Sequence, residues 1–168
     1  MKPRVFADPR GCFFETYQDA RYRARGIGAT FVQDNHSRSS RNTLRGLHYG
    51  VPAQAKLVHV AFGRTYDVAV DLRPESATFG RWHGTVLDAE EPAQLFLPEG
   101  FAHGFCVLSD YAVVAYKVSA RYDAGAEREI LWNDPDLAVS WPVTAPLLSA
   151  RDERAESFAD YARRVARP

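Results

Sequence analysis

The apolar residues of this chain come in short runs between Phe13 and Trp141, and Gly, Pro, Asp and Asn separate the runs. This spacing is typical of β-strands joined by turns, because a helix would repeat apolar residues every three or four positions over a longer stretch. The runs predict six strands, at residues 56–62, 65–72, 94–97, 104–108, 112–119 and 128–132. The middle of the chain is therefore expected to be β structure.

The first two predicted strands are joined through Gly63-Arg64. Glycine at the first central position of a two-residue loop suits a type II′ turn, so we expect these strands to form a hairpin. In the second strand, apolar residues alternate with other residues and share one face. They are Tyr66, Val68, Val70 and Leu72.

Two segments have a helical pattern: residues 19–25, ended by Gly26, and residues 151–166. In the second, apolar residues recur at i, i+3, i+4, i+7 and i+10 and form one stripe. Many short strands, no alternation of strands with helices and one terminal helix predict an all-β fold, a β-sandwich or jelly-roll barrel with a C-terminal helix. The length of 168 residues and the absence of a linker-like segment predict a single domain over residues 1–168.

The charges of the chain balance, since Lys plus Arg and Asp plus Glu both number 21. We therefore expect neither nucleic acid nor membrane as a partner, and an anionic ligand would have to be bound by local arginines. Cys12 and Cys106 form no C-x-x-C pair, so neither a thiolate metal site nor a disulfide framework is predicted. No run of about 18 apolar residues and no signal-peptide pattern occurs, and a cytoplasmic location fits best.

Four polar stretches interrupt the β-rich pattern, and they indicate where the chemistry lies, because burying polar groups is costly unless they are paired or functional. They are FADPRGCFFE at 6–15, QDNHSRSSRNTLRGLHY at 33–49, PEGFAHGF at 98–105 and LSARD at 148–152. Together with AQAKLV at 53–58 and ILWNDP at 130–135, they resemble the dTDP-4-dehydrorhamnose 3,5-epimerase family. The resemblance runs in order from about Pro3 to Asp152. It implies a cupin-like jelly roll that forms a homodimer and binds a dTDP-sugar without a metal or other cofactor.

The resemblance also implies a reaction and its catalytic residues. Such enzymes remove a proton from a carbon beside the C4 ketone of dTDP-4-keto-6-deoxy-D-glucose and return one from the opposite face, giving dTDP-4-dehydro-L-rhamnose. His48 matches the base, an imidazole that titrates near neutral pH, and Asp152 matches the carboxylate that orients it. Tyr116 matches the acid across the sugar. Lys56 and Arg45 match cations near the ketone, where positive charge stabilises an enolate oxygen.

A second set of residues is assigned to substrate binding by the same resemblance. Phe6, Arg10 and Glu15 match the thymidine and phosphate end, contributed across a dimer interface. Arginine suits that end because its planar guanidinium binds phosphate oxygens in pairs. The remaining expected binding residues are Gln33, Asn35, His103, Tyr122 and Arg151, the last as a phosphate or interface candidate.

Each of these residues also has an ordinary structural explanation. Tyr116 lies in an apolar run and could fill the core. Asp152 could favour the dipole of the C-terminal helix from its first turn, and Lys56 could protect an edge strand. The segment from Asp8 to Gly11 reads as a β-turn with an exposed Arg10. For His36, His59 and His83 we expect only hydrogen-bonded structural roles.

Other functions remain as alternatives. The loop of residues 49–55 is about two residues shorter than is usual in the family, and Arg121 replaces a common aromatic residue, so inversion at C3 alone stays open. A metal-dependent cupin, an oxygenase or isomerase, would need clustered ligands, and Tyr49-Gly50 after His48 does not supply them. A noncatalytic sugar-binding cupin and a dTDP-sugar 3,4-ketoisomerase are further alternatives. The set of His48, Tyr116 and Asp152 and the LRGLHY and LSARD motifs favour the epimerase.

Overall fold

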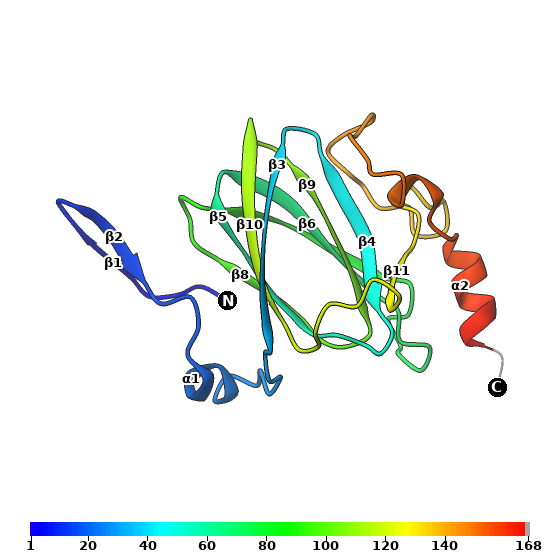
Figure 1. Ribbon diagram of the computed structural model, residues 1–168, viewed down its shortest axis with the longest axis horizontal. Helices are drawn as coiled ribbons and strands as arrows, with labels where there is room; N and C mark the ends of the chain where they lie inside the picture. The colour runs from blue at the N-terminus through cyan, green and yellow to red at the C-terminus, as the bar shows by residue number, and fades with distance from the viewer. Residues whose placement is uncertain (167–168) are drawn as a thin grey trace.

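The structure, a computed structural model, describes residues 1–166 of the chain. Two antiparallel sheets face each other, with a hairpin at one end of the molecule and a helix at the other (Figure 1). The strands are β1 (Val5–Asp8), β2 (Gly11–Phe14), β3 (Gln33–Ser40), β4 (Leu44–Gly50), β5 (Lys56–Phe62), β6 (Arg64–Asp71), β7 (Trp82–Asp88), β8 (Gln94–Leu97), β9 (Phe101–Val107), β10 (Tyr111–Val118) and β11 (Glu127–Glu129). The helices are α1 (Asp19–Arg23), a 3₁₀ turn (Asp152–Arg154) and α2 (Phe158–Val165).

The order of strands is β3-β10-β5-β8 in one sheet and β11-β4-β9-β6-β7 in the other. Apolar side chains from both sheets meet between them, among them Val58, Val114, Phe105 and Val107. Burying these side chains is the main source of stability for such a two-sheet fold. The predicted all-β jelly roll with a C-terminal helix is confirmed.

A second core lies on the outer face of the five-stranded sheet. Val68, Val70 and Leu72 pack there with Leu47 and with Tyr161 of α2. The predicted apolar face of the second strand is thus correct, and the C-terminal segment covers it. Because successive side chains of a strand point to opposite faces, Thr65, Asp67 and Ala69 of β6 point between the two sheets.

The hairpin predicted at Gly63-Arg64 is wrong. Strand β5 pairs with β10 and β8, whereas β6 pairs with β9 and β7, so the two strands belong to different sheets. Gly63 has a φ of +74° and carries the chain from one sheet to the other. A Cβ atom at this position would lie 2.3 Å from the carbonyl oxygen of Tyr111, so the crossing needs glycine.

The single helix predicted for residues 151–166 is also wrong, since the segment is split. The 3₁₀ turn ends before Ala155, whose backbone is extended, and α2 begins after Ser157, whose side chain accepts a hydrogen bond from the amide of Asp160. Glu156 instead exchanges backbone hydrogen bonds with Glu129 and Leu131, which removes it from any helix. Tyr161 is the buried residue of α2, although it is not part of the predicted apolar stripe, which consists of Ala155, Phe158, Ala159, Ala162 and Val165.

The remaining differences concern strands that the predicted apolar runs do not cover. Strands β1, β2, β3, β4 and β7 were not predicted. In place of the last predicted strand, at residues 128–132, the structure has only the shorter strand β11. The short helix near residue 19 is confirmed as α1. No helix within residues 1–166 is long and apolar enough to cross a membrane.

Candidate active site

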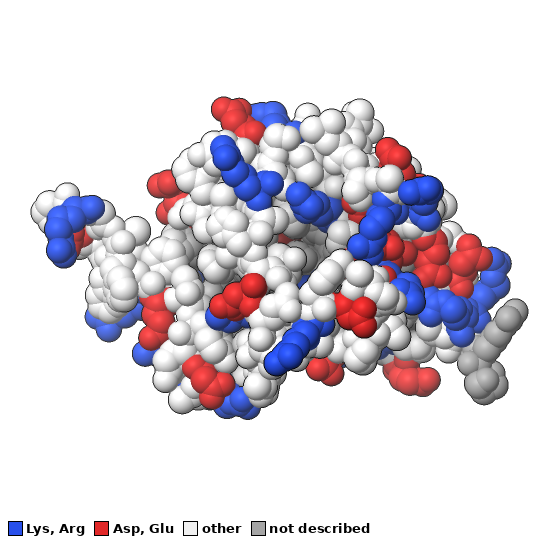
Figure 2. All heavy atoms as spheres, viewed as in Figure 1, with Lys and Arg blue, Asp and Glu red and all other residues white. Residues whose placement is uncertain are grey.

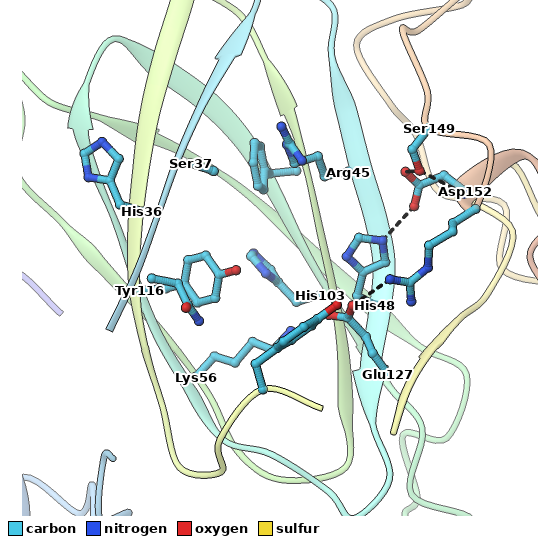
Figure 3. A pocket seen from close by; sticks show the side chains of 14 residues that line it. His36, Ser37, Arg45, His48, Lys56, His103, Tyr116, Glu127, Ser149 and Asp152 are labelled. Atoms are coloured by element: carbon cyan, nitrogen blue, oxygen red, sulfur yellow. Dashed lines mark hydrogen bonds and ion pairs between the residues drawn. The ribbon is translucent and has the colours of Figure 1, made fainter. Parts of the chain in front are cut away.

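A cavity of about 470 Å³ lies between the two sheets, and nine of the thirteen predicted site residues line it. Strands β3, β5 and β10 form one wall, β4, β9 and β11 the other, and the segment before α2 closes one side (Figure 3). In the space-filling view this face is hollowed near its centre, with acidic and basic side chains interspersed around it (Figure 2). The fold therefore assembles the predicted residues from six separate segments.

His48 and Asp152 form a hydrogen bond of 2.6 Å between Nε2 and Oδ1. The side chain of His48 is 25% exposed to the cavity, whereas that of Asp152 is 3% exposed. Burial alone would raise the pKa of Asp152, but hydrogen bonds with His48 and Ser149 outweigh burial and lower it. An ionised Asp152 can only accept a hydrogen bond, so His48 carries hydrogen on Nε2 and keeps the lone pair of Nδ1 available as a base.

Tyr116 lies on β10, in the wall opposite His48 (Figure 3). Its neighbours across the strands are Asn35 and Val58. Burial, followed by the negative charge of Glu127, raises the pKa of Tyr116, so the phenol holds its proton. A protonated phenol that faces a base across a cavity can act as a general acid.

Lys56, on β5, is only 6% exposed. Burial lowers its pKa to about 8, and the opposing effect of Glu127 does not compensate. Within residues 1–166 its ammonium forms no salt bridge. A second cavity, of about 320 Å³, lies beside the 49–55 loop and shares Lys56, Tyr122 and Glu127 with the first. Lys56 therefore brings a buried positive charge without a salt-bridge partner to the cavity, suited to an anionic oxygen.

Three binding candidates are held by polar contacts around the cavity. Arg45 donates a hydrogen bond of 3.0 Å from Nε to Ser39. Gln33 does not line the cavity, but its amide donates to Asn35 at 2.7 Å and accepts from the backbone of Tyr122 at 2.8 Å. Gln33 thus positions two residues that line the cavity: Asn35, on the same strand, and Tyr122, on the loop after β10.

Arg151 lines the cavity, but its guanidinium is engaged. It donates to Glu127 at 3.1 Å and also contacts Glu129, both on β11. In this structure the positive charge of Arg151 is therefore paired with two carboxylates. A phosphate would have to compete with them for Arg151.

Phe6, Arg10 and Glu15 lie away from the cavity. Phe6 and Arg10 belong to the β1–β2 hairpin, which projects from the body (Figure 1), and Phe6 is 50% exposed. Arg10 forms a salt bridge with Asp8 at 2.6 Å, and Glu15 one with Arg21 at 2.8 Å. A single chain does not bring these three residues to its own cavity.

The histidines expected to be structural lie mainly outside the cavity. His83 is exposed on β7, His59 is partly buried on β5, and His36 is exposed on β3 at the cavity's edge. Within residues 1–166 none of them forms a side-chain hydrogen bond, so the predicted hydrogen bonds are absent. In the same residues, no group of three or more His, Cys, Asp or Glu side chains is placed to hold a metal ion.

The family model described as dTDP-4-dehydrorhamnose 3,5-epimerase matches residues 1–160. The chain belongs to this family. A relative with that name from Pseudomonas aeruginosa is 54% identical over 163 residues, covering 95% of this chain and 90% of the relative. One from Neisseria gonorrhoeae is 50% identical over 161 residues, covering 95% of this chain but only 49% of that longer protein. The predicted family and its enzyme class, isomerase, are confirmed.

A solved structure supports the same relationship. The dTDP-6-deoxy-D-glucose-3,5-epimerase of Legionella pneumophila, in complex with dTDP-4-keto-L-rhamnose, superposes with a TM-score of 0.91 at 44% identity. The match covers 95% of this chain and 89% of that chain. The cupin-like fold implied by the resemblance is therefore confirmed at the level of the backbone.

Several residues of this epimerase-family site were not singled out from the sequence. Ser149 donates a hydrogen bond of 2.6 Å to Asp152, and Glu127 lies beside Lys56 and Arg151. Asp67, on β6, pairs with His103 at 2.9 Å. An available signal was the placement of Asp67 within the apolar alternation of TYDVAV, where a buried carboxylate needs a partner.

Proposed function

We propose that this chain inverts C3 and C5 of dTDP-4-keto-6-deoxy-D-glucose and so produces dTDP-4-dehydro-L-rhamnose. The observation that carries the proposal is the placement of His48 and Tyr116 on opposite walls of one cavity, with Lys56 on the same wall as Tyr116. A base and an acid on opposite sides are what inversion of a carbon centre requires. The names of the relatives agree with this reaction.

The reaction proceeds through an enolate. Nδ1 of His48 takes the proton from C3, and the electrons of the C–H bond form a C3–C4 double bond while the ketone oxygen becomes negative. Lys56 stabilises that oxygen, and a charge placed in a buried site is more effective than one in water. Tyr116 then gives its phenolic proton to the opposite face of C3, the ketone re-forms, and solvent restores both side chains. Repetition at C5 completes the conversion without any cofactor.

The nucleotide half of the substrate is assigned to a homodimer. Phe6, Arg10 and Glu15 lie away from their own cavity, and an isolated two-stranded hairpin is marginally stable in water. The outer face of the four-stranded sheet also exposes apolar surface, where Phe62 stacks on Tyr111 at 4.6 Å. Packing of two such faces would cover this surface and bring each hairpin to the partner's cavity.

The proposed location is the cytoplasm. Cys12 and Cys106 are both free thiols, which agrees with a reducing compartment. Fractionation of the native host with an antibody to the chain tests this part, and recovery in an extracellular fraction would contradict it.

Deuterium exchange tests the reaction. With dTDP-4-keto-6-deoxy-D-glucose in heavy water, we expect NMR to show deuterium at both C3 and C5 and a product with the L-rhamno configuration. His48→Ala should lower exchange by about 10²–10⁴-fold, whereas His83→Ala, on the exposed face of β7, should leave it unchanged. Exchange at C3 alone would identify a C3 epimerase instead. No exchange with the wild-type protein would overturn the proposed function and favour a binding module.

A further inference from the structure

Glu127, a residue that the sequence analysis did not single out, lies between two cations of the cavity. It begins β11, and it faces the cavity from the wall opposite Lys56 (Figure 3). One of its carboxylate oxygens accepts a hydrogen bond of 3.1 Å from the guanidinium of Arg151. The side chain of Arg151 is 46% exposed and that of Glu127 is 27% exposed. A salt bridge this open to solvent is weak, so a stronger anion can take the guanidinium from Glu127.

The charge of Glu127 also acts on the opposite wall. Burial lowers the pKa of Lys56 to about 8, and the negative charge of Glu127 is what opposes that effect. Glu127 lines both of the cavities that Lys56 lines. While Arg151 is bound to Glu127, its positive charge offsets part of this carboxylate's field at Lys56. Lys56 therefore has a nearby carboxylate whose charge is only partly available to it.

The other carboxylates around the two cavities are engaged elsewhere. Asp152 accepts a hydrogen bond from His48, and Asp123, on the exposed loop after β10, accepts one from a backbone amide of its own loop. The remaining ionisable lining consists of arginine, histidine and tyrosine side chains, among them Arg45, His48, His103, Tyr116, Arg121 and Tyr122. Within residues 1–166, Glu127 is therefore the carboxylate of these cavities best placed to serve Lys56.

We propose that Glu127 is a counter-ion shared by Arg151 and Lys56, and that a diphosphate which draws Arg151 away leaves the charge of Glu127 to Lys56. The inference rests on the function proposed above, which supplies the diphosphate. A guanidinium binds phosphate oxygens in pairs, which gives the ligand an advantage over the single hydrogen bond from Glu127. Glu127 is then a positioning residue that acts through Lys56. Binding of the nucleotide half keeps the ammonium charged for the chemical step.

Lysine NMR tests the shared counter-ion directly, because the chain has only three lysines, Lys2, Lys56 and Lys117. With carbon-13 in the lysine side chains, the signal that disappears in Lys56→Gln belongs to Lys56, and its pH titration gives the pKa. We expect saturating dTDP to raise the Lys56 pKa by about one unit in the wild type. In Glu127→Gln the Lys56 pKa should be lower without ligand, and dTDP should raise it much less.

Removal of Arg151 should imitate the ligand. In Arg151→Ala without dTDP, Glu127 has lost its partner, so the Lys56 pKa should already be raised. In the double variant Arg151→Ala with Glu127→Gln, loss of the arginine should have no further effect, which separates an effect through Glu127 from a direct one. Glu129→Gln is the matched control. Glu129 also contacts Arg151 from β11 but does not line the cavity, so the response of Lys56 to dTDP should remain.

The pH profiles give a second readout that a purely structural role would not change. The profile of kcat/KM reports the free enzyme and that of kcat the enzyme with substrate bound. For the wild type and Glu129→Gln, we expect the alkaline decline of kcat to lie about one pH unit above that of kcat/KM. For Glu127→Gln, the two declines should lie close together.

The outcomes separate this inference from the proposed function. Normal turnover, with a Lys56 pKa that dTDP leaves unchanged or raises equally in Glu127→Gln, would overturn the inference alone. A wild-type protein that neither binds dTDP nor turns over the ketosugar would reject the proposed function and the inference with it. If Glu127→Gln does not fold, ligand-free Arg151→Ala still decides, because an unchanged Lys56 pKa in that variant would contradict the shared counter-ion.

Discussion

The two histidines of the cavity wall have similar partners and different exposure, and exposure sets what each can do. His48 is partly open, so a proton taken from a substrate can pass on to solvent. His103 is nearly enclosed and held by a fully buried carboxylate, which suits recognition better than proton transfer. Ser149 and Thr65 take equivalent places behind Asp152 and Asp67.

Asp152→Asn should therefore reduce activity strongly. The amide would donate to Nε2 of His48, and Nδ1 would then carry the hydrogen and could not act as the base. We expect kcat to fall about 10²–10⁴-fold with little change in KM, measured by coupled reduction of the product ketone. Ser149→Ala, which removes one hydrogen bond to the carboxylate, should have a much smaller effect. Near-normal kcat for Asp152→Asn would contradict the assigned role.

We expect Lys56 to set the alkaline side of the pH profile. Its pKa is lowered to about 8, so the ammonium is charged below that pH and neutral above it. Stabilisation of the enolate is then present at neutral pH and lost as pH rises through about 8. We expect kcat/KM to decline about tenfold per pH unit above this value. Lys56→Gln should be about 10²–10³-fold less active and lack that decline. A decline that persists in Lys56→Gln would assign it to another group.

Among the elements, the C-terminal segment links stability to the site. Its 3₁₀ turn presents Asp152 to His48, and α2 then packs Tyr161 on the outer face of the five-stranded sheet. Asp134, which is 2% exposed, anchors the helix by accepting a hydrogen bond of 2.8 Å from the amide of Phe158. The same carboxylate accepts from the amides of Asp136 and Leu137. One buried side chain thus holds both the 134–137 loop and the start of α2.

Asp134→Ala should for this reason lower the free energy of unfolding by about 1–3 kcal/mol, since one buried and two partly buried amides lose their acceptor. Urea denaturation followed by circular dichroism measures the change. Asp160→Ala, at an exposed residue in the first turn of α2, is the matched control and should lower the free energy of unfolding clearly less than Asp134→Ala. Equal losses in the two variants would show that Asp134 is not the anchor.

For the whole molecule, the projecting hairpin is the feature that a single chain does not explain. It carries Phe6 and Arg10, while the cavity that would use them holds His48 and Tyr116. The proposed dimer connects the two, so each active site would combine residues from two chains. Mass measurement in solution tests the dimer itself, and complementation tests the crossing.

Mixing two inactive variants should restore activity. If Arg10 serves the partner's cavity, a heterodimer of Arg10→Ala and His48→Ala has one doubly impaired site and one intact site. Random reassortment should then recover about a quarter of wild-type activity per site, because half of the dimers are mixed and each has one intact site of two. Co-refolding followed by an activity assay measures the recovery. No recovery, with mixed dimers demonstrated by differently tagged chains, would place Arg10 at its own chain's site or outside it.

Local sequence was sufficient for the elements whose chemistry is local. Short apolar runs and turn residues specified β5, β8 and β10, and Gly26 marked the end of α1, because strand periodicity and turn geometry depend on neighbouring residues. The polar stretches and the family resemblance of the chain pointed to His48, Lys56, Tyr116 and Asp152 as candidate site residues. Strand β3 was not predicted, because polar residues line the cavity along one of its faces.

Long-range contacts decided the rest, since nothing in a local pattern reports which distant segments will meet. The sequence at Gly63 predicts a hairpin turn, yet Gly63 joins two sheets. Strand β5 pairs with β10 and β8, whereas β6 pairs with β9 and β7. The apolar stripe of residues 155–165 predicts one helix, but the backbone of Glu156 pairs with β11 and its neighbours and splits it. Asp152 and His48 are 104 residues apart, and Asp67 and His103 are 36 apart. Packing of the two sheets brings each pair together, and burial makes each hydrogen bond strong enough to fix a tautomer.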